Sequence, residues 1–204
     1  MFSPDSKIMQ ILGRITDLIL LNLLFLITCL PVFTIGAATT ALYTICFRLM
    51  REEYSGITKS YFKAFRANFK TATAAWGILL VIAVPAVYYL SRTFQMEGVL
   101  QLTGLLFAMI LLVSLMMGSY AFPWISQFDN SVTQSLTNSL ILSVSRLPRT
   151  AAILAINLMP VIVLFINADL FIQISFLWIA LYFAAAAYMN TGLLWHVFKP
   201  YRNE

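Results

Sequence analysis

Charged residues are scarce in this sequence, and acidic residues are scarcer than basic ones. Of its 204 residues only 10% are charged, with 13 lysines and arginines against 8 aspartates and glutamates, whereas 61% are apolar. A soluble domain typically has about 25% charged residues. No polar stretch is long enough to fold by itself. The composition therefore predicts an integral membrane protein in which residues 1–204 form a single transmembrane domain.

The residue types that usually carry catalysis are also few. His196 is the single histidine. The two cysteines, Cys29 and Cys46, lie in apolar stretches, where we expect them to pack as small hydrophobic side chains and not to form a disulfide. The sequence shows no paired carboxylates at membrane depth, no histidine cluster and no glycine-rich phosphate loop. We therefore expect a protein that is not an enzyme and that has no cofactor, no metal and no nucleic-acid partner.

Six apolar segments approach the roughly 20 helical residues that are needed to cross about 30 Å of hydrocarbon. They are residues 15–34, 36–50, 73–91, 99–124, 150–166 and 171–197. The predicted fold class is all-α, a polytopic transmembrane helix bundle of about six spans. The first apolar run follows Lys7 and Arg14 and is too long for a cleaved signal peptide, so we expect it to be retained as a membrane anchor.

The basic residues fall on one side of this predicted bundle. Of the 13 lysines and arginines, only Arg92 lies on the predicted outer side. The others are Lys7, Arg14, Arg48, Arg51, Lys59, Lys63, Arg66, Lys70, Arg146, Arg149, Lys199 and Arg202. Because positive charge marks the cytoplasmic side of a membrane protein, we expect both termini to be cytoplasmic.

Polar residues inside the apolar stretches are few. They are Asp17, Asn22, Asn157, Asn190 and Thr191. No ionisable residue lies deep within the last four predicted spans, where a charge is the usual mark of an ion or proton pathway. Transport by a proton relay is therefore not favoured.

A proline and a glycine interrupt the run formed by the first two segments. This run is too long for one crossing and has basic residues at both ends, so the chain must reverse between Pro31 and Gly36. Pro31 lacks a backbone donor, and Gly36 permits a tight reversal at an outer hairpin tip. Since the second arm is short, a half-depth re-entrant hairpin is the alternative. Gly36, Ala37, Thr40 and Ala41 form a ridge of small residues suited to close helix packing.

Two amphipathic helices are predicted on the cytoplasmic side. The first is "YFKAFRANFK" (residues 61–70), in which an aromatic face adjoins a basic stripe. The aromatic residues are Tyr61, Phe62, Phe65 and Phe69, and the basic residues are Lys63, Arg66 and Lys70. This pattern is typical of a helix at the membrane surface, against anionic headgroups, and the same residues are our candidate contact with a partner protein. The second helix covers residues 132–147.

Three stretches carry a resemblance to a known family. They are "LPVFTIGAATTALY" (residues 30–43), "FKAFRANFKTAT" (62–73) and "SLTNSLILSVSRLPRTAAILAINLMPV" (135–161). With them the chain resembles the YesL-like family, small membrane proteins of unknown function in Gram-positive bacteria. The family offers no established catalytic or binding residues. Its members commonly accompany carbohydrate-uptake ABC systems and glycan-degrading enzymes, so the resemblance implies a role linked to sugar import at the plasma membrane of such a bacterium.

From these features we expect an accessory subunit that packs beside the permeases of an oligosaccharide ABC importer. Two alternatives stay open. One is a stand-alone or homo-oligomeric transporter whose broken hairpin lines the path. The other is a membrane sensor or assembly factor for glycan utilisation. Membrane lipids are the second class of expected partner.

Overall fold

The computed structural model describes residues 7–53, 56–93 and 98–201, and for residues 7–11, 99 and 100 it describes the backbone alone. All secondary structure in these ranges is helical. Within them, six helical segments are long and apolar enough to cross a membrane: 12–29, 32–50, 57–93, 103–125, 147–166 and 175–201. The prediction of an all-α chain with six such segments is confirmed. Of the predicted inner cations, Arg202 and the side chain of Lys7 lie outside the described residues.

The break between the first two helices falls where the sequence predicts it. Helix α1 (Lys7–Cys29) ends before Pro31, a 3₁₀ turn (Val32–Thr34) follows, and α2 (Ile35–Met50) begins directly after the turn. The Thr34 hydroxyl donates to the carbonyls of Thr28 and Pro31, both at 2.6 Å. The Trp76 indole donates to the Val32 carbonyl at 2.9 Å. Carbonyls that the break frees therefore have donors, which a turn away from water requires.

Gly36 has a different role from the one expected. It lies inside α2, so the chain reversal does not depend on its conformational freedom. A Cβ atom at this position would lie 2.5 Å from the Ala72 carbonyl oxygen and 2.7 Å from the Trp76 Cβ. Glycine is needed here because α3 passes too close for any side chain.

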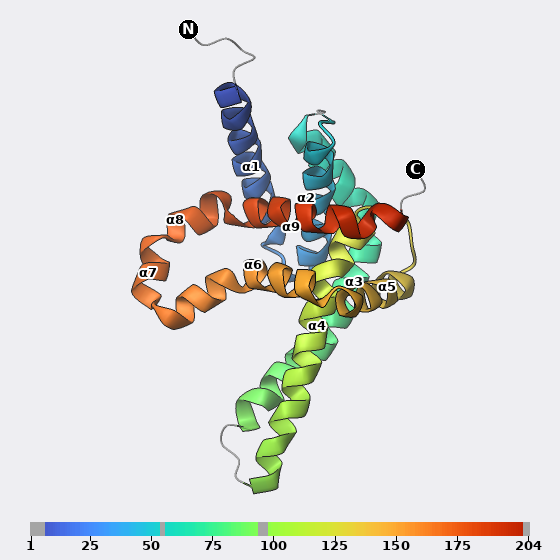
Figure 1. The fold of residues 1–204 in the computed structure, drawn as a ribbon, viewed down its shortest axis with the longest axis vertical. Helices are drawn as coiled ribbons and strands as arrows, with labels where there is room; N and C mark the ends of the chain where they lie inside the picture. The colour runs from blue at the N-terminus through green and yellow to red at the C-terminus, as the bar shows by residue number, and fades with distance from the viewer. Residues whose placement is uncertain (1–6, 54–55, 94–97, 202–204) are drawn as a thin grey trace.

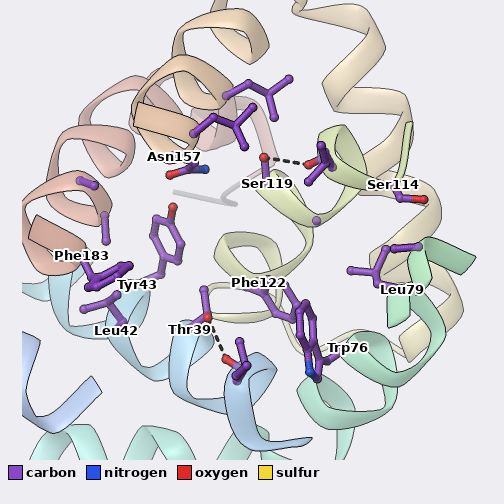
Figure 2. A pocket seen from close by; sticks show the side chains of 18 of the residues that line it. Thr39, Leu42, Tyr43, Trp76, Leu79, Ser114, Ser119, Phe122, Asn157 and Phe183 are labelled. Atoms are coloured by element: carbon purple, nitrogen blue, oxygen red, sulfur yellow. Dashed lines mark hydrogen bonds between the residues drawn. The ribbon is translucent and has the colours of Figure 1, made fainter. Parts of the chain in front are cut away.

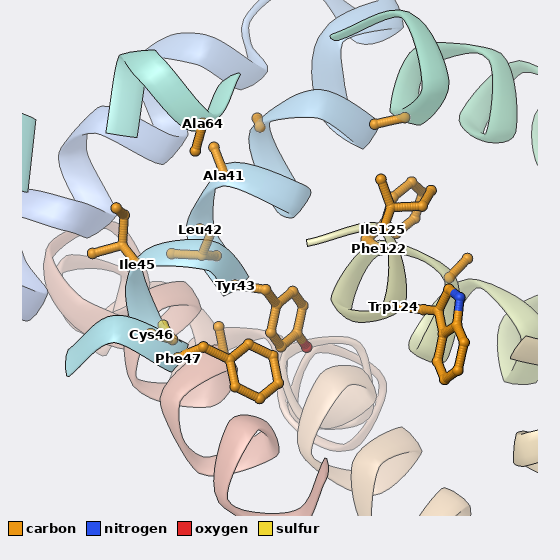
Figure 3. Packing of buried hydrophobic residues seen from close by; sticks show 14 of the residues in the cluster. Ala41, Leu42, Tyr43, Ile45, Cys46, Phe47, Ala64, Phe122, Trp124 and Ile125 are labelled. Atoms are coloured by element: carbon orange, nitrogen blue, oxygen red, sulfur yellow. The ribbon is translucent and has the colours of Figure 1, made fainter. Parts of the chain in front are cut away.

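Helix α2 is the central element of the fold. Most of its residues are buried, including Ala37, Ala41, Cys46 and Phe47, which are fully buried. It packs against α1, α3, α4 and α9. Figure 3 shows Ala41 of α2 facing Ala64 of α3, so the small residues allow the two helices to approach closely.

The α1–α2 turn lies in the middle of the molecule. It contacts Trp76, and α3 (Ile57–Thr93) continues from there to Thr93, a rise of about 25 Å. Figure 1 shows α1 and α2 extending upward from the centre, with the first part of α3 beside α2, while the second part of α3 and α4 (Thr103–Ile125) extend downward. With 16 residues, α2 is about 24 Å long, less than the roughly 30 Å of hydrocarbon.

The first predicted amphipathic segment is not a separate helix. Residues 61–70 form the first part of α3, which runs without interruption into the apolar residues 73–91. No glycine or proline lies between the two parts, so nothing in the sequence stops the helix there. Pro85 lies within α3 and does not end it.

The second predicted amphipathic segment is a helix of its own. Helix α5 (Val132–Ser145) begins with a capping box, in which the Gln134 amide N–H donates to the Ser131 hydroxyl and the Ser131 amide N–H to the Gln134 side chain, both at 3.3 Å. It ends at Arg146, and Pro148 then lies in the first turn of α6 (Leu147–Ile166).

The predicted final span is interrupted. Short helices α7 (Ala168–Gln173) and α8 (Ser175–Leu177) come first, then a π-helix (Trp178–Tyr182), then α9 (Phe183–Phe198) and a terminal 3₁₀ turn, Lys199–Tyr201. Figure 1 shows that α6 and α9 point to one side of the molecule while the α3–α4 pair points downward. The chain thus builds two diverging hairpins around α2.

One asparagine fixes the π-helix to α1. The Asn22 amide group donates to the Ile179 carbonyl at 2.6 Å and accepts from the Ala184 amide N–H at 2.9 Å. Ile179 and Ala184 are five residues apart, which is the spacing of hydrogen bonds in a π-helix. Asn22 is fully buried, so its side chain takes the place of water at an opened turn.

Close packing at Gly36 predicts a sharp difference between two glycines. We expect Gly36→Ala to destabilise the protein by about 1–3 kcal/mol, because its methyl group would meet the backbone of α3. Gly77→Ala is the matched control, since a Cβ there meets no atom within 4 Å. Thermal unfolding in detergent measures both, and equal stability of the two variants would contradict the packing role of Gly36.

Candidate functional site

The aromatic residues of the predicted docking segment face into the protein. Tyr61 is fully buried, and its hydroxyl lies 2.6 Å from the Thr28 hydroxyl and donates to the Ala38 carbonyl at 3.3 Å. Phe65 and Phe69 are half-buried and follow Tyr61 at intervals of four residues, with ring centroids 6.5 and 5.5 Å apart along the series. This face of α3 therefore packs against α1 and α2, and only Phe62 of the four aromatic residues is exposed.

The basic residues of the same segment stay on the surface. Lys63, Arg66 and Lys70 are exposed. The ion pairs among the described residues are Arg14–Glu52 at 3.3 Å and Arg51–Glu53 at 3.7 Å, and neither involves this stripe. Its positive charge is thus available to lipid headgroups or to an acidic surface.

The small residues after Pro31 hold the centre of the bundle together. Ala37, Thr40 and Ala41 are fully buried, whereas Pro31 is exposed at the turn. Gly36 lies against both α3 and α4, since a Cβ atom added at this position would also lie 2.9 Å from a ring carbon of Phe122. These contacts bring five helices close enough to enclose a cavity.

A hollow of about 410 Å³ lies between the two diverging hairpins. It is lined by residues of α2, α3, α4, α6, the π-helix and the start of α9, together with Phe25 of α1. Figure 2 shows Trp76, Phe122 and Leu79 on one side and Tyr43, Phe183 and Asn157 on the other. The lining is mostly apolar, and the described lining residues include no carboxylate, histidine or cysteine. A mostly apolar lining with a few polar groups is typical of a ligand-binding cavity.

A small polar group lies at one wall of this cavity. The Asn190 amide, fully buried, donates to the Asn157 carbonyl oxygen at 2.7 Å and to the Tyr43 hydroxyl at 3.2 Å. Asn157 and Tyr43 both line the cavity, and Figure 2 shows the Tyr43 hydroxyl directed toward Asn157. One buried side chain thus orients two polar groups from different helices.

Irregular helix geometry gathers around the same cavity. Pro160 removes the amide that would donate to the Ile156 carbonyl four residues earlier, and the Tyr182 hydroxyl donates to that carbonyl instead. Tyr182 belongs to the π-helix, and π-helical turns are frequent at functional sites. Pro123 in α4 likewise cannot donate to the carbonyl of Ser119, another lining residue.

The sequence revealed this site only in part. Asn157 and Asn190 stand out in the sequence as polar residues in apolar stretches. The hydrogen bond between them was not predicted from the sequence. Tyr43 has no distinguishing local pattern, because a tyrosine in an apolar helix resembles any packing residue. In the described residues, no three His, Cys, Asp or Glu side chains are close enough to hold a metal ion.

Comparison with known proteins gives a family match over part of the chain. The family described as "Protein of unknown function, DUF624" matches residues 18–90, which cover about half of α1, all of α2 and nearly all of α3. No curated protein and no solved structure matches the chain. The similarity therefore includes the buried hairpin and the basic stripe, and assigns no activity to them.

The length of α3 predicts opposite exposure at its two ends. From Lys63 to Arg92 the helix rises about 44 Å, more than the roughly 30 Å of hydrocarbon. We expect Lys63→Cys and Arg92→Cys, each in a Cys29→Ala/Cys46→Ala background, to react with an impermeant maleimide from opposite sides of the membrane. Tyr61→Cys is the buried control and should not react from either side. Labelling of both ends from one side would contradict the arrangement.

Proposed function

We propose that this chain is a non-enzymatic accessory subunit that packs beside the permease subunits of a carbohydrate ABC importer in the plasma membrane of a Gram-positive bacterium. The link to sugar import comes from the resemblance of residues 30–43, 62–73 and 135–161 to the YesL-like family. The observation that carries the packing role is the exposure of α6.

Helix α6 makes few contacts for its length. Of its 20 residues only Thr150 and Ile153 are buried. Ala151 and Ala155 are exposed and lie one turn apart on one face. In lipid, small residues at this spacing allow a second helix to approach closely, whereas large apolar residues serve equally well against lipid tails. This face is therefore the proposed contact with a permease helix.

The basic stripe of α3 supports the same role at the membrane surface. Lys63, Arg66 and Lys70 lie together on the first part of α3, with Phe62 exposed next to them. This stripe either holds anionic headgroups or contacts the partner outside the hydrocarbon. Either contact would hold the subunit in a fixed position beside its partner.

The cavity argues against sugar transport by this chain alone. A sugar carries many hydroxyl groups, and each one that is buried without a hydrogen bond costs about 1–3 kcal/mol. The cavity offers mainly leucine, alanine and phenylalanine side chains. An accessory role fits this lining better than a sugar path does.

Affinity purification in mild detergent tests the proposal. We expect the tagged wild-type chain to retain importer permease subunits. Ala151→Leu/Ala155→Leu should lower their recovery roughly tenfold, equivalent to about 1.4 kcal/mol, because the added side chains hold the partner helix away. Ala168→Leu, at an exposed alanine on α7, is the control and should leave recovery unchanged.

Two results would count against this role. Recovery of the wild-type chain without any permease subunit would overturn it, and sugar uptake by liposomes containing this chain alone would support the transporter alternative. Lys63→Ala/Arg66→Ala/Lys70→Ala separates the two uses of the stripe. Recovery falls if the stripe contacts the partner and is unchanged if it contacts headgroups.

A further inference from the structure

The cavity between the hairpins has little hydrogen-bonding capacity left for a ligand. Most of its polar lining groups already donate to backbone carbonyls: Thr39 to Ile35 at 2.7 Å, Ser114 to Ile110 and Ser119 to Leu115 at 2.8 Å, Trp76 to Val32 at 2.9 Å, and Tyr182 to Ile156. Figure 2 shows the bonds of Thr39 and Ser119 turned into their own helices. These donors stabilise the walls and do not serve a ligand.

Two adjacent groups keep donors that face the hollow. The Tyr43 hydroxyl accepts a hydrogen bond from Asn190, and its own hydrogen has no acceptor among the described residues. The side-chain oxygen of Asn157 also accepts from Asn190. The two side-chain N–H groups of Asn157 have no acceptor among the described residues. Because Asn190 holds both groups in place, their donors can converge on one oxygen atom.

The pair lies near mid-length of two helices. Tyr43 is about 10 Å along α2 from Met50, and Asn157 is about 17 Å along α6 from Arg146. Both helices belong to segments that are apolar enough to cross a membrane. A ligand that reaches the pair must therefore itself be largely apolar.

The remainder of the hollow is long and apolar. Its lining along α4 runs from Phe122 to Leu111, a rise of about 16 Å. Leu79 and Phe183 form parts of the opposite walls. A slot of this shape, with two hydrogen-bond donors at one wall, complements an apolar chain that carries one acceptor oxygen.

We infer that the cavity binds one acyl chain of a membrane phospholipid. An ester carbonyl oxygen accepts hydrogen bonds from the Tyr43 hydroxyl and the Asn157 amide. The acyl chain lies along α4 between the two hairpins. The site has room for a single acyl chain, because its volume of about 410 Å³ is at the small end of the range for ligand pockets.

Fluorescence quenching by a phospholipid with brominated acyl chains tests this site. The probe is titrated into the delipidated full-length chain in detergent, where Trp76 lines the cavity. We expect a saturable component with one lipid per chain, which Trp76→Phe removes. Tyr43→Phe and Asn157→Leu should each weaken binding about fivefold, since each removes one hydrogen bond worth about 1 kcal/mol.

A blocking variant and a matched control separate the cavity from the general lipid surface. Ser119→Phe fills the hollow and should abolish the saturable component, whereas Ala74→Phe adds similar bulk on the exposed face of α3 and should preserve it. Thermal unfolding confirms that each variant is folded.

Quenching that is linear in lipid and unchanged by Ser119→Phe would overturn the site. A dimer in light scattering that carries no lipid, and that Ser119→Phe dissociates, would overturn it as well, because it would assign the cavity to a second copy of the chain. Loss of the lipid site leaves permease recovery as a separate measurement of the proposed function.

Discussion

Backbone hydrogen bonds that lose their helical partners must be satisfied without bulk water in this protein, and the architecture depends on how that is done. Three sites in the apolar segments show how these groups find partners. At the α1–α2 turn, Thr34 and Trp76 donate to freed carbonyls. At the π-helix, Asn22 bridges a carbonyl and an amide, and at Pro160 the Tyr182 hydroxyl replaces the missing donor. In water, solvent would fill these positions.

Most of these bonds also connect distant parts of the chain. Trp76 ties α3 to the first turn, Asn22 ties α1 to the π-helix, and Tyr182 ties that π-helix to α6. Together they fix the α6–α9 hairpin relative to α1 and α2. Gly36 adds the close approach of α2 to α3 and α4. These few hydrogen bonds, and the space left at Gly36, set the angle between the two hairpins. The cavity between the hairpins follows from that angle.

The sequence predicted the features that depend on length, charge and backbone chemistry. Apolar runs located the six segments, and Pro31 located the first break. It did not predict the continuity of α3, because a basic half and an apolar half resemble two helices when nothing separates them. Tyr61 faces inward although cations adjoin it, since its partners on α1 and α2 are invisible to local periodicity. The polar group at the cavity joins residues 33 and 147 positions apart, beyond any local pattern.

Helix α6 is the element on which the two proposals meet. Leu154, Asn157 and Leu158 line the cavity, while Ala151 and Ala155 are exposed on an adjoining face of the same helix. A partner helix on the alanine face would therefore lie beside the cavity and not inside it. An acyl chain behind that helix would fill space that the protein leaves open, and so would support the partner's packing without competing for its contacts. On this view α6 makes few contacts within the chain because its contacts are with lipid and a neighbouring subunit.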